Sequence, residues 1–474
     1  MSWEVVIGLE VHTQLTTKTK LFSGTSTLYG QEPNTQAGIF DLALPGVLPR
    51  LNDGVIDKAI RLAIATNSKV QQRTIFERKH YFYPDLPKGY QTSQLDAPIV
   101  YDGHLMIETE SGLKKIRVNR AHLEEDAGGS RHGVVPGMTG IDLNRAGTPL
   151  LEIVSEPDLS SASEAISYLR QLHQIVTWLD ISDGNMQEGS FRCDANVSIR
   201  KPGEPLGTRT ELKNINSFRF IEQAINYEVA RQIKILESGG TITQETRLYD
   251  SDKNETRSMR AKEEANDYRY FHDPDLLPII ISDERIDAVK ASFPLMPEEL
   301  KVELMEKHDL SDYDAGVLVQ SRAMADYFAA LLSFKADAKI AVNWLLGDVS
   351  AYLNEKDLEI SELSISAERL AGLLNRIQDK TISNNIAKKV FALMIDSEKS
   401  ADEVIEAEGL KQVTDTGAIE GWVDEVIAKN PKQVEQFKSG QTKILGFFVG
   451  QVMKLSQGKA DPAVINQMIA EKLQ

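Results

Sequence analysis

Two segments in which apolar and polar residues alternate constrain the fold of this chain more than any other feature. In residues 6–15, one side of the predicted strand is apolar and the other carries Glu10, His12 and Gln14. Residues 191–199 repeat the pattern, and their polar positions are Arg192, Asp194, Asn196 and Ser198. Because successive side chains of a strand point to opposite faces, both segments predict strands with one core face and one polar face. A strand that only shows its polar side to water would alternate in the same way.

The single cysteine, Cys193, falls on the apolar side of the second segment. Neither a histidine nor a basic residue shares that side to lower its pKa, so we expect a core residue and not a nucleophile. One cysteine also excludes an internal disulfide and a zinc site built from clustered cysteines. This usage is typical of a reducing compartment, and we expect a cytoplasmic protein.

The first part of the chain, up to about residue 293, contains short β-rich runs separated by glycine and proline. Helices interrupt these runs, and we expect them at residues 55–65, 163–179 and 217–236. With 474 residues the chain exceeds what one core usually holds. The sequence therefore predicts an α+β protein of two or three domains, with a β-rich part first.

The character of the sequence changes from Met296 onward, because strand patterns end and capped amphipathic segments follow one another. Ser311 is expected to cap a helix whose apolar side carries Val317, Met324, Phe328 and Leu331. A further helical unit is expected to begin near Ser400. We therefore expect a domain boundary near residue 293 and only helices after it.

Charge and hydropathy exclude several classes of protein. The formal charge of −17 argues against broad electrostatic attraction to nucleic acid, so any RNA contact has to be local. The acidic start lacks the features of a signal peptide, and no run of about 18 apolar residues occurs. We expect neither a secreted protein nor a membrane protein.

Further acidic residues favour a cation shared with the polar strand faces. Residues 122–126 hold three carboxylates, and Glu211 lies two residues before Lys213 on a predicted strand that leads into a helix. Neighbouring carboxylates repel one another unless a cation joins them, and Mg²⁺ prefers oxygen ligands. Solvated acids on a loop are the alternative explanation.

Residues 77–91 mix basic and aromatic side chains, as do surfaces that stack nucleobases and neutralise phosphates. Aromatic packing beneath a loop would give the same composition. The sequence contains neither a G-x-x-x-x-G-K-[ST] loop nor a G-x-G-x-x-G motif after a strand. The common nucleotide-binding folds are therefore not supported.

Five stretches together carry a family resemblance: residues 7–12, 78–91, 122–128, 142–145 and 188–196. In this order they closely resemble motifs of the B subunits of the aspartyl/glutamyl-tRNA amidotransferases, and the resemblance covers essentially the whole chain. It implies three domains. These are a β-rich, cradle-like catalytic domain at 1–293, an all-α helical domain at 294–405, and a small helical tail domain at 406–474 that binds tRNA.

The resemblance also implies the reaction and the partners. Mischarged Glu-tRNA(Gln), Asp-tRNA(Asn) or both are phosphorylated by ATP on the side-chain carboxylate, and ammonia then displaces the phosphate. Ammonia is expected from the amidase, which is the A subunit of such a heterotrimer, and the small C subunit bridges the other two proteins. Because oxide is a poor leaving group, phosphorylation makes the acyl carbon reactive, and neutralising charge is the main demand on the protein.

We assign roles from this chemistry to the polar residues of the motifs. A Mg²⁺ site is expected from Glu10, His12, Glu124, Glu125 and Glu211, in which His12 binds directly or through water. Catalytic roles are expected for Lys79, Arg192 and Lys213, which face phosphates and developing charge, and for Asn214, which positions the substrate. The expected ATP contacts are Arg192, Asp194, Asn196 and Lys213. The expected tRNA contacts are Lys432, Lys438, Lys443, Lys454 and Lys459, which are interleaved with glycines.

Two positions depart from the family pattern. Gly129 stands where a lysine is commoner, and His272 stands where a proline is commoner. If that lysine contacts phosphate in relatives, the role is vacant here or filled by another base. The second change concerns loop stiffness.

Two other classes of function remain open. A non-catalytic RNA-binding scaffold would bind no metal on its acidic strand faces, and Mg²⁺-dependent ATP hydrolysis that requires mischarged tRNA would reject it. A self-contained ATP-dependent ligase would use free ammonia, and dependence on the amidase for the use of glutamine would reject it.

Overall fold

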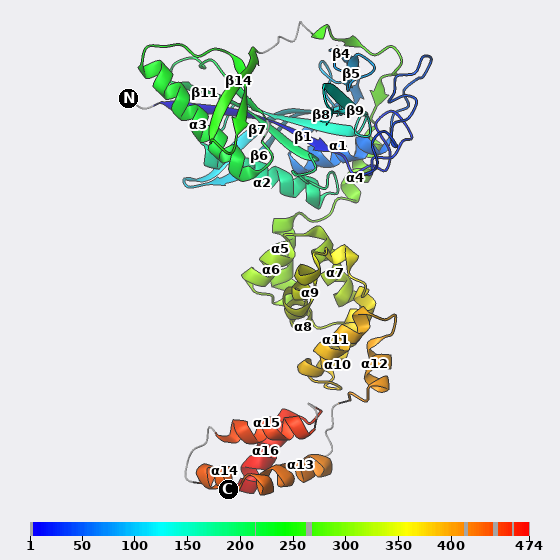
Figure 1. Ribbon diagram of the computed structural model, residues 1–474, viewed down its shortest axis with the longest axis vertical. Helices are drawn as coiled ribbons and strands as arrows, with labels where there is room; N and C mark the ends of the chain where they lie inside the picture. Colours follow the sequence, from blue (N-terminus) through cyan, green and yellow to red (C-terminus); the bar gives the residue numbers. More distant parts are fainter. Residues whose placement is uncertain are drawn as a thin grey trace. The chain divides into compact units, whose positions relative to one another are not determined.

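The computed structural model describes residues 3–213, 215–261, 268–411, 416–438, 444–456 and 459–473. The chain divides into two compact units, Met1–Pro294 and Leu295–Gln474. The first is β-rich and the second is helical (Figure 1). The predicted α+β class is confirmed. The further division of the helical part into two domains stays a prediction.

The first unit is built on a nine-stranded sheet with the order β14-β13-β12-β11-β1-β10-β7-β6-β2. Neighbouring strands are antiparallel except β12 and β13, which are parallel. The strands are β1 (Glu4–Gln14), β2 (Lys69–Val70), β6 (Val100–Thr109), β7 (Gly112–Glu125), β10 (Pro149–Ser155), β11 (Phe191–Arg200), β12 (Thr210–Lys213), β13 (Glu245–Asp250) and β14 (Glu255–Ala261).

The predicted alternation of β1 and β11 produces a core face and a polar face. Ile7, Leu9 and Val11 of β1 are 0–1% exposed. Cys193 of β11 lies on the same side, and burial raises the pKa of its thiol well above the usual value. The prediction that this cysteine is a core residue is therefore confirmed.

Three helices cover the sheet: α1 (Gly54–Ala65), α2 (Ala162–Trp178) and α3 (Phe218–Glu237). α1 and α2 pack on β6, α3 packs on β11, and α2 contacts both other helices. Serine caps begin two of them, because Ser161 accepts the N–H of Glu164 and Ser217 accepts the N–H of Phe220. The polar side chains of β1 and β11 lie on the opposite face of the sheet.

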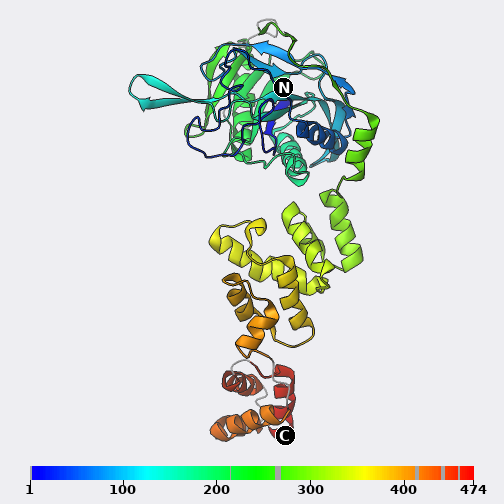
Figure 2. The same ribbon diagram turned by 90° about the vertical axis from the view of Figure 1, so that its right-hand side faces the viewer.

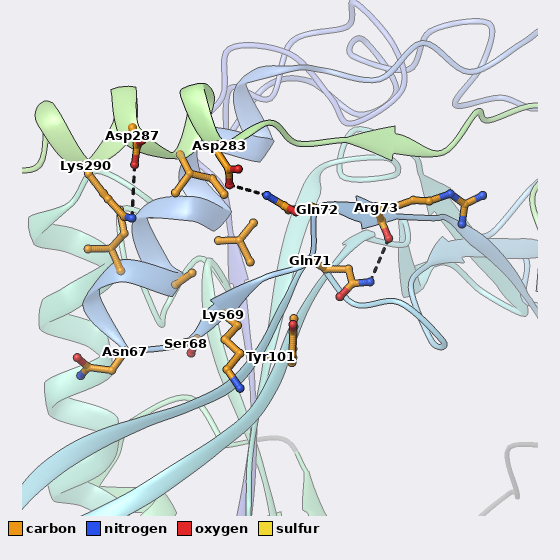
Figure 3. A pocket seen from close by; sticks show the side chains of 14 residues that line it. Asn67, Ser68, Lys69, Gln71, Gln72, Arg73, Tyr101, Asp283, Asp287 and Lys290 are labelled. Atoms are coloured by element: carbon orange, nitrogen blue, oxygen red, sulfur yellow. Dashed lines mark hydrogen bonds and ion pairs between the residues drawn. The ribbon is translucent and has the colours of Figure 1, made fainter.

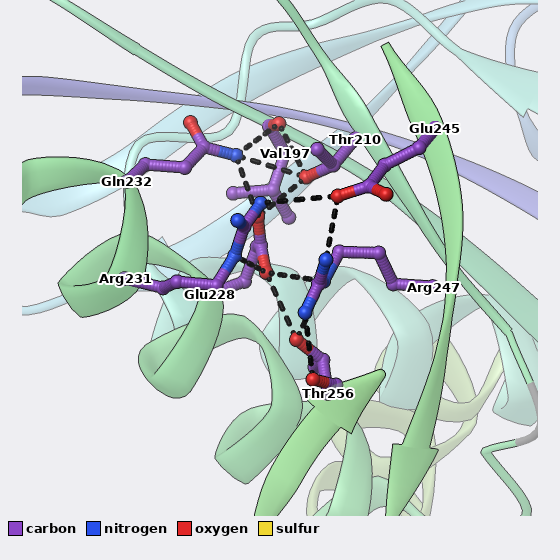
Figure 4. Close-up of polar contacts among 8 residues, drawn as sticks. All are labelled: Val197, Thr210, Glu228, Arg231, Gln232, Glu245, Arg247 and Thr256. Carbon is purple, nitrogen blue, oxygen red and sulfur yellow. Dashed lines mark hydrogen bonds and ion pairs between the residues drawn. The ribbon is translucent and has the colours of Figure 1, made fainter. Parts of the chain in front are cut away.

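Buried polar contacts fix α3 to the edge of the sheet (Figure 4). Glu228 of α3 is fully buried, and it accepts hydrogen bonds from Thr210 of β12 at 2.7 Å and from Thr256 of β14 at 3.2 Å. Arg231 of the same helix donates to Glu228 at 2.7 Å, and Arg247 of β13 lies 3.5 Å from it. These contacts hold β12, which carries Glu211 and Lys213.

Smaller sheets surround the main one. They pair β3 (Arg73–Thr74) with β16 (Ile279–Ile280), β4 (Glu77–His80) with β5 (Tyr90–Ser93) and β15 (Phe271–His272), and β8 (Gly129–Val135) with β9 (Met138–Asp142). β5 contacts β7, which brings the basic and aromatic segment beside the main sheet. The β8–β9 hairpin extends from the body of the unit (Figure 2). Helix α4 (Asp283–Ala291) packs on α1 at the end of this unit.

The second unit begins with α5 (Pro297–His308), α6 (Asp312–Leu318), α7 (Arg322–Ser333), α8 (Ala338–Trp344), α9 (Ser350–Lys356), α10 (Ala367–Gln378), α11 (Asn384–Ile395) and α12 (Ala401–Ala407). The predicted cap at Ser311 is confirmed, because its side chain accepts the N–H of Asp314. The apolar residues expected after it are divided between two helices, since α6 ends at Leu318. Ser321 caps a second helix by accepting the N–H of Met324. Ser400 caps α12 in a capping box with Glu403.

The last helices are α13 (Thr416–Lys429), α14 (Pro431–Lys438), α15 (Leu445–Leu455) and α16 (Pro462–Leu473). They share a core of their own, in which Ile419, Phe448 and Ile465 are fully buried. Among the described residues, no helix is both long enough and apolar enough to cross a membrane.

Candidate functional site

Polar side chains from neighbouring strands meet on the open face of the main sheet. In the register of β1 and β11, Glu10 lies opposite Asp194 and His12 lies opposite Arg192. On its other side His12 lies opposite Glu152 of β10. This pairing cannot be read from any one strand, because β11, β1 and β10 are far apart in sequence.

His12, Glu124 and Glu152 form a first group of potential cation ligands, which we call the His12 group. One ligand atom from each lies within 4.8 Å of the others. Nε2 of His12 is 3.1 Å from Oε2 of Glu152 and 3.7 Å from Oε1 of Glu124. Nε2 of His122 lies 3.6 Å from Glu152, and its buried Nδ1 finds no hydrogen-bond partner within the described part of the chain.

The charges of the His12 group shift the pKa values of His12 and Glu152. Burial by itself lowers the pKa of His12, but Glu152 and Glu124 outweigh burial and raise the pKa to about 9. Burial likewise favours the neutral form of Glu152, yet His122 and His12 hold its pKa well below the usual range. Without a metal, a proton on His12 therefore balances one of the two carboxylates of the group.

Glu10, Asp194 and Glu211 form a second group, which we call the Glu10 group, and their ligand atoms also lie within 4.8 Å of one another. Asn196 donates to Glu10 at 2.8 Å, which fixes one carboxylate oxygen. Thr246 donates to Glu211 at 2.7 Å from the adjacent strand β13. All three ligands are carboxylates, so the group offers only oxygen atoms to a cation.

Lysine and arginine side chains border both groups. Nζ of Lys213 forms an ion pair with Asp194 and lies 3.6 Å from Glu211. Burial opposes its charge, but these carboxylates raise the pKa of Lys213 above its usual value. Arg192 donates from Nη2 to Asp126 at 3.0 Å. The Nε of Arg192 is buried and lacks a hydrogen-bond partner among the described residues.

Lys79 approaches from β4. Its Nζ lies 4.9 Å from the ring centroid of Tyr268, and its charge contributes to the lowered pKa of Glu152. Two aromatic residues that follow Lys79 in the sequence are exposed, Phe82 by 79% and Tyr83 by 55%. Two aromatic rings are thus open to solvent in the segment next to the polar face.

Glu125, a predicted metal ligand, is in neither group. Its carboxylate forms an ion pair with Lys88 and accepts the backbone N–H of Thr92 at 2.9 Å. Successive residues of β7 point to opposite sides, so Glu124 faces His12 and Glu125 faces the small β4–β5–β15 sheet. The structure therefore divides the five predicted ligands into Glu10 with Glu211, His12 with Glu124, and Glu125 apart.

A pocket of about 160 Å³ lies next to Glu10 and Asn196. Its other walls include Pro157, Leu206 and Arg209, so apolar surface stands beside one guanidinium. A second pocket, of about 820 Å³, lies between α1, β2 and α4 (Figure 3). No predicted site residue lines this larger pocket.

The remaining predicted residues lie outside the two groups. Asn214 and Lys443 are outside the described residues, and so is the side chain of Lys438. Lys432 and Lys454 are exposed on α14 and α15, and Lys459 is half-buried just before α16. These three lysines belong to the second unit and are placed only within it.

Sequence reasoning missed Glu152 and His122. Glu152 is the one charged residue of a strand that is otherwise apolar up to Ser155, Pro-Leu-Leu-Glu-Ile-Val-Ser, and this isolated charge indicates a functional role. His122 precedes Glu124 by two residues and so shares its face.

The two departures occupy different surroundings. Gly129 begins β8 and lines a pocket that also contains Arg131 and Arg145, so other bases stand near it. His272 pairs with Glu77, and together with Asp96 they form another group of close ligand atoms. The Glu77 carboxylate accepts the N–H groups of Leu95 at 2.6 Å and Asp96 at 2.9 Å. These hydrogen bonds account for the burial of Glu77 without a metal ion.

Comparison with known proteins places this geometry in a family. Residues 5–287 match the GatB/GatE catalytic domain, and residues 326–473 match the GatB domain. Proteins named as B subunits of aspartyl/glutamyl-tRNA(Asn/Gln) amidotransferases align over the full length of both chains. They are 61% identical in Hydrogenovibrio crunogenus, 58% in Alkalilimnicola ehrlichii and 59% in Thioalkalivibrio sulfidiphilus. The chain therefore belongs to the family of aspartyl/glutamyl-tRNA(Asn/Gln) amidotransferase B subunits, a family of ligase-type enzymes.

Proposed function

We propose that this chain carries out the ATP-dependent amidation of Glu-tRNA(Gln), Asp-tRNA(Asn) or both, in the cytoplasm. The γ-phosphoryl group of ATP is transferred to the side-chain carboxylate of the mischarged amino acid, which gives an acyl phosphate and ADP. Ammonia then attacks the acyl carbon and inorganic phosphate leaves. The observation that carries the proposal is the pair of cation-ligand groups side by side on one sheet face, with lysine and arginine next to them.

The donor sets suit Mg²⁺. The Glu10 group offers three carboxylates near a single lysine, so it keeps net negative charge on a partly buried face unless a cation binds. The His12 group has two carboxylates and an imidazole. In the absence of a metal, the proton on His12 supplies part of the positive charge that a second cation would bring. A bound Mg²⁺ would neutralise phosphate charge at this face. Glu125 is the less suitable ligand, because Lys88 already pairs with it.

The chain's own bases have distinct tasks in this scheme. Lys213, held between Asp194 and Glu211, sits where it can contact a phosphate bound at the Glu10 group. Arg192, oriented by Asp126, presents a guanidinium between both groups. Lys79 lies close enough to the His12 group for its charge to lower the pKa of Glu152. Together they neutralise charge on the transferred phosphoryl group, which is the main requirement of phosphoryl transfer.

The binding of ATP and of the tRNA end has separate support. The pocket of about 160 Å³ beside Glu10 and Asn196 combines apolar walls with Arg209, and its volume suits one part of a nucleotide bound next to a metal. Phe82 and Tyr83 expose rings that can stack on unpaired bases at the end of a tRNA. Exposed Lys432 and Lys454 in the helical tail offer contacts to tRNA phosphates.

Ammonia comes from another chain in this proposal. Cys193 is buried and its pKa is raised, so it cannot act as a glutaminase nucleophile. Relatives are named as the B subunits of an amidotransferase, which supports assembly with further proteins. We assign the release of ammonia to the amidase, the A subunit of a heterotrimer, and the link between the two to its small C subunit.

The experiment is an assay of the reconstituted complex with each mischarged tRNA, with and without ATP and Mg²⁺. We expect amide formation that requires ATP, Mg²⁺ and mischarged tRNA, and glutamine use that requires the amidase. ATP hydrolysis that ignores the mischarged tRNA would contradict the proposal. Amide formation from free ammonia that gains nothing from the amidase and glutamine would favour the self-contained ligase, and tRNA binding without any ATP use would favour the scaffold.

A further inference from the structure

An unusual number of apolar side chains is exposed on one irregular segment of the first unit, residues 28–48. The segment has no helix or strand, yet six large apolar residues in it are between 39% and 70% exposed. They are Leu28, Tyr29, Ile39, Leu42, Leu44 and Leu48. Scattered single exposures are normal on a protein surface, but a cluster of this kind marks an interaction site.

The segment is held in place by a buried ion pair. Lys20 is 0% exposed, and its Nζ lies 3.2 Å from Oδ2 of Asp41. The same nitrogen donates to the backbone oxygen of Gln36 at 2.6 Å. The N–H of Gly38 also donates to Asp41, at 2.8 Å. A lysine is buried only when its charge is fully used, so this contact fixes the middle of the segment.

Amide side chains fix the start of the segment to the β8–β9 hairpin region. Asn34 donates to the backbone oxygen of Ile141 at 2.8 Å and accepts the N–H of Leu143 at 2.7 Å. Asn144 accepts the N–H of Gln36 at 2.8 Å and donates to the backbone oxygen of Glu32 at 2.8 Å. The exposed apolar side chains are therefore presented by a preorganised backbone, which lowers the entropy cost of binding a partner.

The charge of the segment indicates what covers it. Residues 28–48 contain neither lysine nor arginine, and their two acids are Glu32 and the buried Asp41. The segment itself therefore offers no positive charge to the phosphates of tRNA, and the nearest bases, Arg131 and Arg145, line the pocket at its start. Exposed apolar side chains on a rigid loop instead suit the apolar core of a protein interface.

The position of the segment relates it to the site. Leu28 and Tyr29 line a pocket of about 650 Å³ together with Gln14 and Arg145. Gln14 donates to Asp126 at 2.9 Å, and Asp126 is the carboxylate that also holds Arg192. A protein seated on the segment therefore lies next to the inner end of β1, where the polar face begins.

We propose that residues 28–48 are the docking surface for the protein that supplies ammonia. The inference rests on the proposed function, because that function requires ammonia from another chain and places its use at the polar face. The partner is a protein with an apolar patch, and it binds through Leu28, Leu48 and their neighbours. The buried Lys20–Asp41 pair acts only by holding the segment in its binding shape.

The test uses the full-length chain with Leu28 and Leu48 both changed to serine. The matched control changes Leu113 and Leu277 to serine, which are 70% and 87% exposed elsewhere in the same unit. Affinity for the glutaminase partner is measured by calorimetry. Amide formation is then measured with glutamine and, separately, with added ammonium chloride.

We expect the Leu28→Ser/Leu48→Ser chain to bind the glutaminase partner roughly tenfold or more weakly. Glutamine-driven amidation should fall by a similar factor at limiting partner concentration, while ammonium-driven amidation and tRNA affinity stay at the level of the control. Retained ammonium-driven activity also shows that the variant is folded.

Unchanged affinity for the glutaminase partner would overturn the proposal, and so would an equal loss in the control. Loss of tRNA affinity with normal assembly would also overturn it, because the segment would then contact RNA. If the unmodified chain forms no amide with ammonium, the proposed function fails, whereas the affinity measurement still decides on the docking surface.

Discussion

Glu152 is the residue on which the His12 group depends most, so its charge is the sharpest perturbation of the site. Replacing Glu152 with glutamine keeps the size of the side chain and removes one of two carboxylates around His12. At the 3.1 Å between Glu152 and His12, a unit charge pair interacts by about 5 kcal/mol at an effective dielectric constant of about 20. A divalent cation held there loses attraction of at least that order.

Desolvation of the cation and its ligands offsets part of this attraction. We therefore expect a net loss of about 2.7 kcal/mol, which corresponds to a rate of carboxylate phosphorylation about 100-fold lower. The affinity for Mn²⁺, measured by electron paramagnetic resonance, should fall by at least about tenfold. The glutaminase activity of the partner should survive.

The control is Glu156→Gln, which removes a carboxylate just beyond the same strand, where Asn119 donates to it at 2.6 Å. This variant should keep both Mn²⁺ affinity and phosphorylation. If Glu152→Gln phosphorylates the substrate at the rate of the control, the His12 group does not hold a catalytic cation and the reasoning fails.

Three further changes test other parts of the account. Lys213→Ala should slow phosphorylation by roughly 100-fold, since it removes a charge next to the Glu10 group, whereas Lys201→Ala at the end of the neighbouring strand should not; equal rates would contradict the role of Lys213. Glu228→Gln should lower the free energy of unfolding by about 3 kcal/mol at pH 7. Burial opposes the charge of Glu228, but Arg231, Gln232 and Thr210 lower its pKa in the folded state, so its contribution is present above the unfolded pKa of about 4.3 and is lost as pH falls below that value. Denaturant titrations at pH 7 and pH 3 check this, and a difference that grows toward pH 3 would refute it. Removing residues after Gly409 should weaken tRNA binding and flatten its dependence on salt by somewhat under one unit of slope for each lost phosphate contact; filter binding across a salt series with unchanged affinity and slope would show that the tail does not contact tRNA.

Local patterns predicted much of the fold because they report which side of an element is buried. Alternation was enough to place Glu10 and His12 on one face and Cys193 on the other. Serine caps marked the starts of α2 and α3. The break between α6 and α7 was missed because an apolar pattern continues across it, and only the cap at Ser321 signals the new helix.

The grouping of site residues could not be derived from local patterns, because it depends on which strands are neighbours. Glu152 joins His12 only because β10 lies beside β1, and Glu211 joins Glu10 only through β11 and β12. Strand alternation alone does show that the two neighbouring glutamates of β7 cannot both belong to the His12 group. Glu124 and Glu125 are successive residues of β7, so one of them at most can face His12.

The central claim is that the polar face of the sheet transfers a phosphoryl group to a carboxylate carried by tRNA. The most direct measurement is a single-turnover assay in which γ-labelled ATP and Glu-tRNA(Gln) are mixed with the complex in the absence of glutamine and ammonium. The account predicts label on the glutamyl carboxylate with the unmodified chain and a loss of roughly 100-fold or more with Glu10→Gln combined with Glu152→Gln. Normal transfer of label by the double variant would contradict the account.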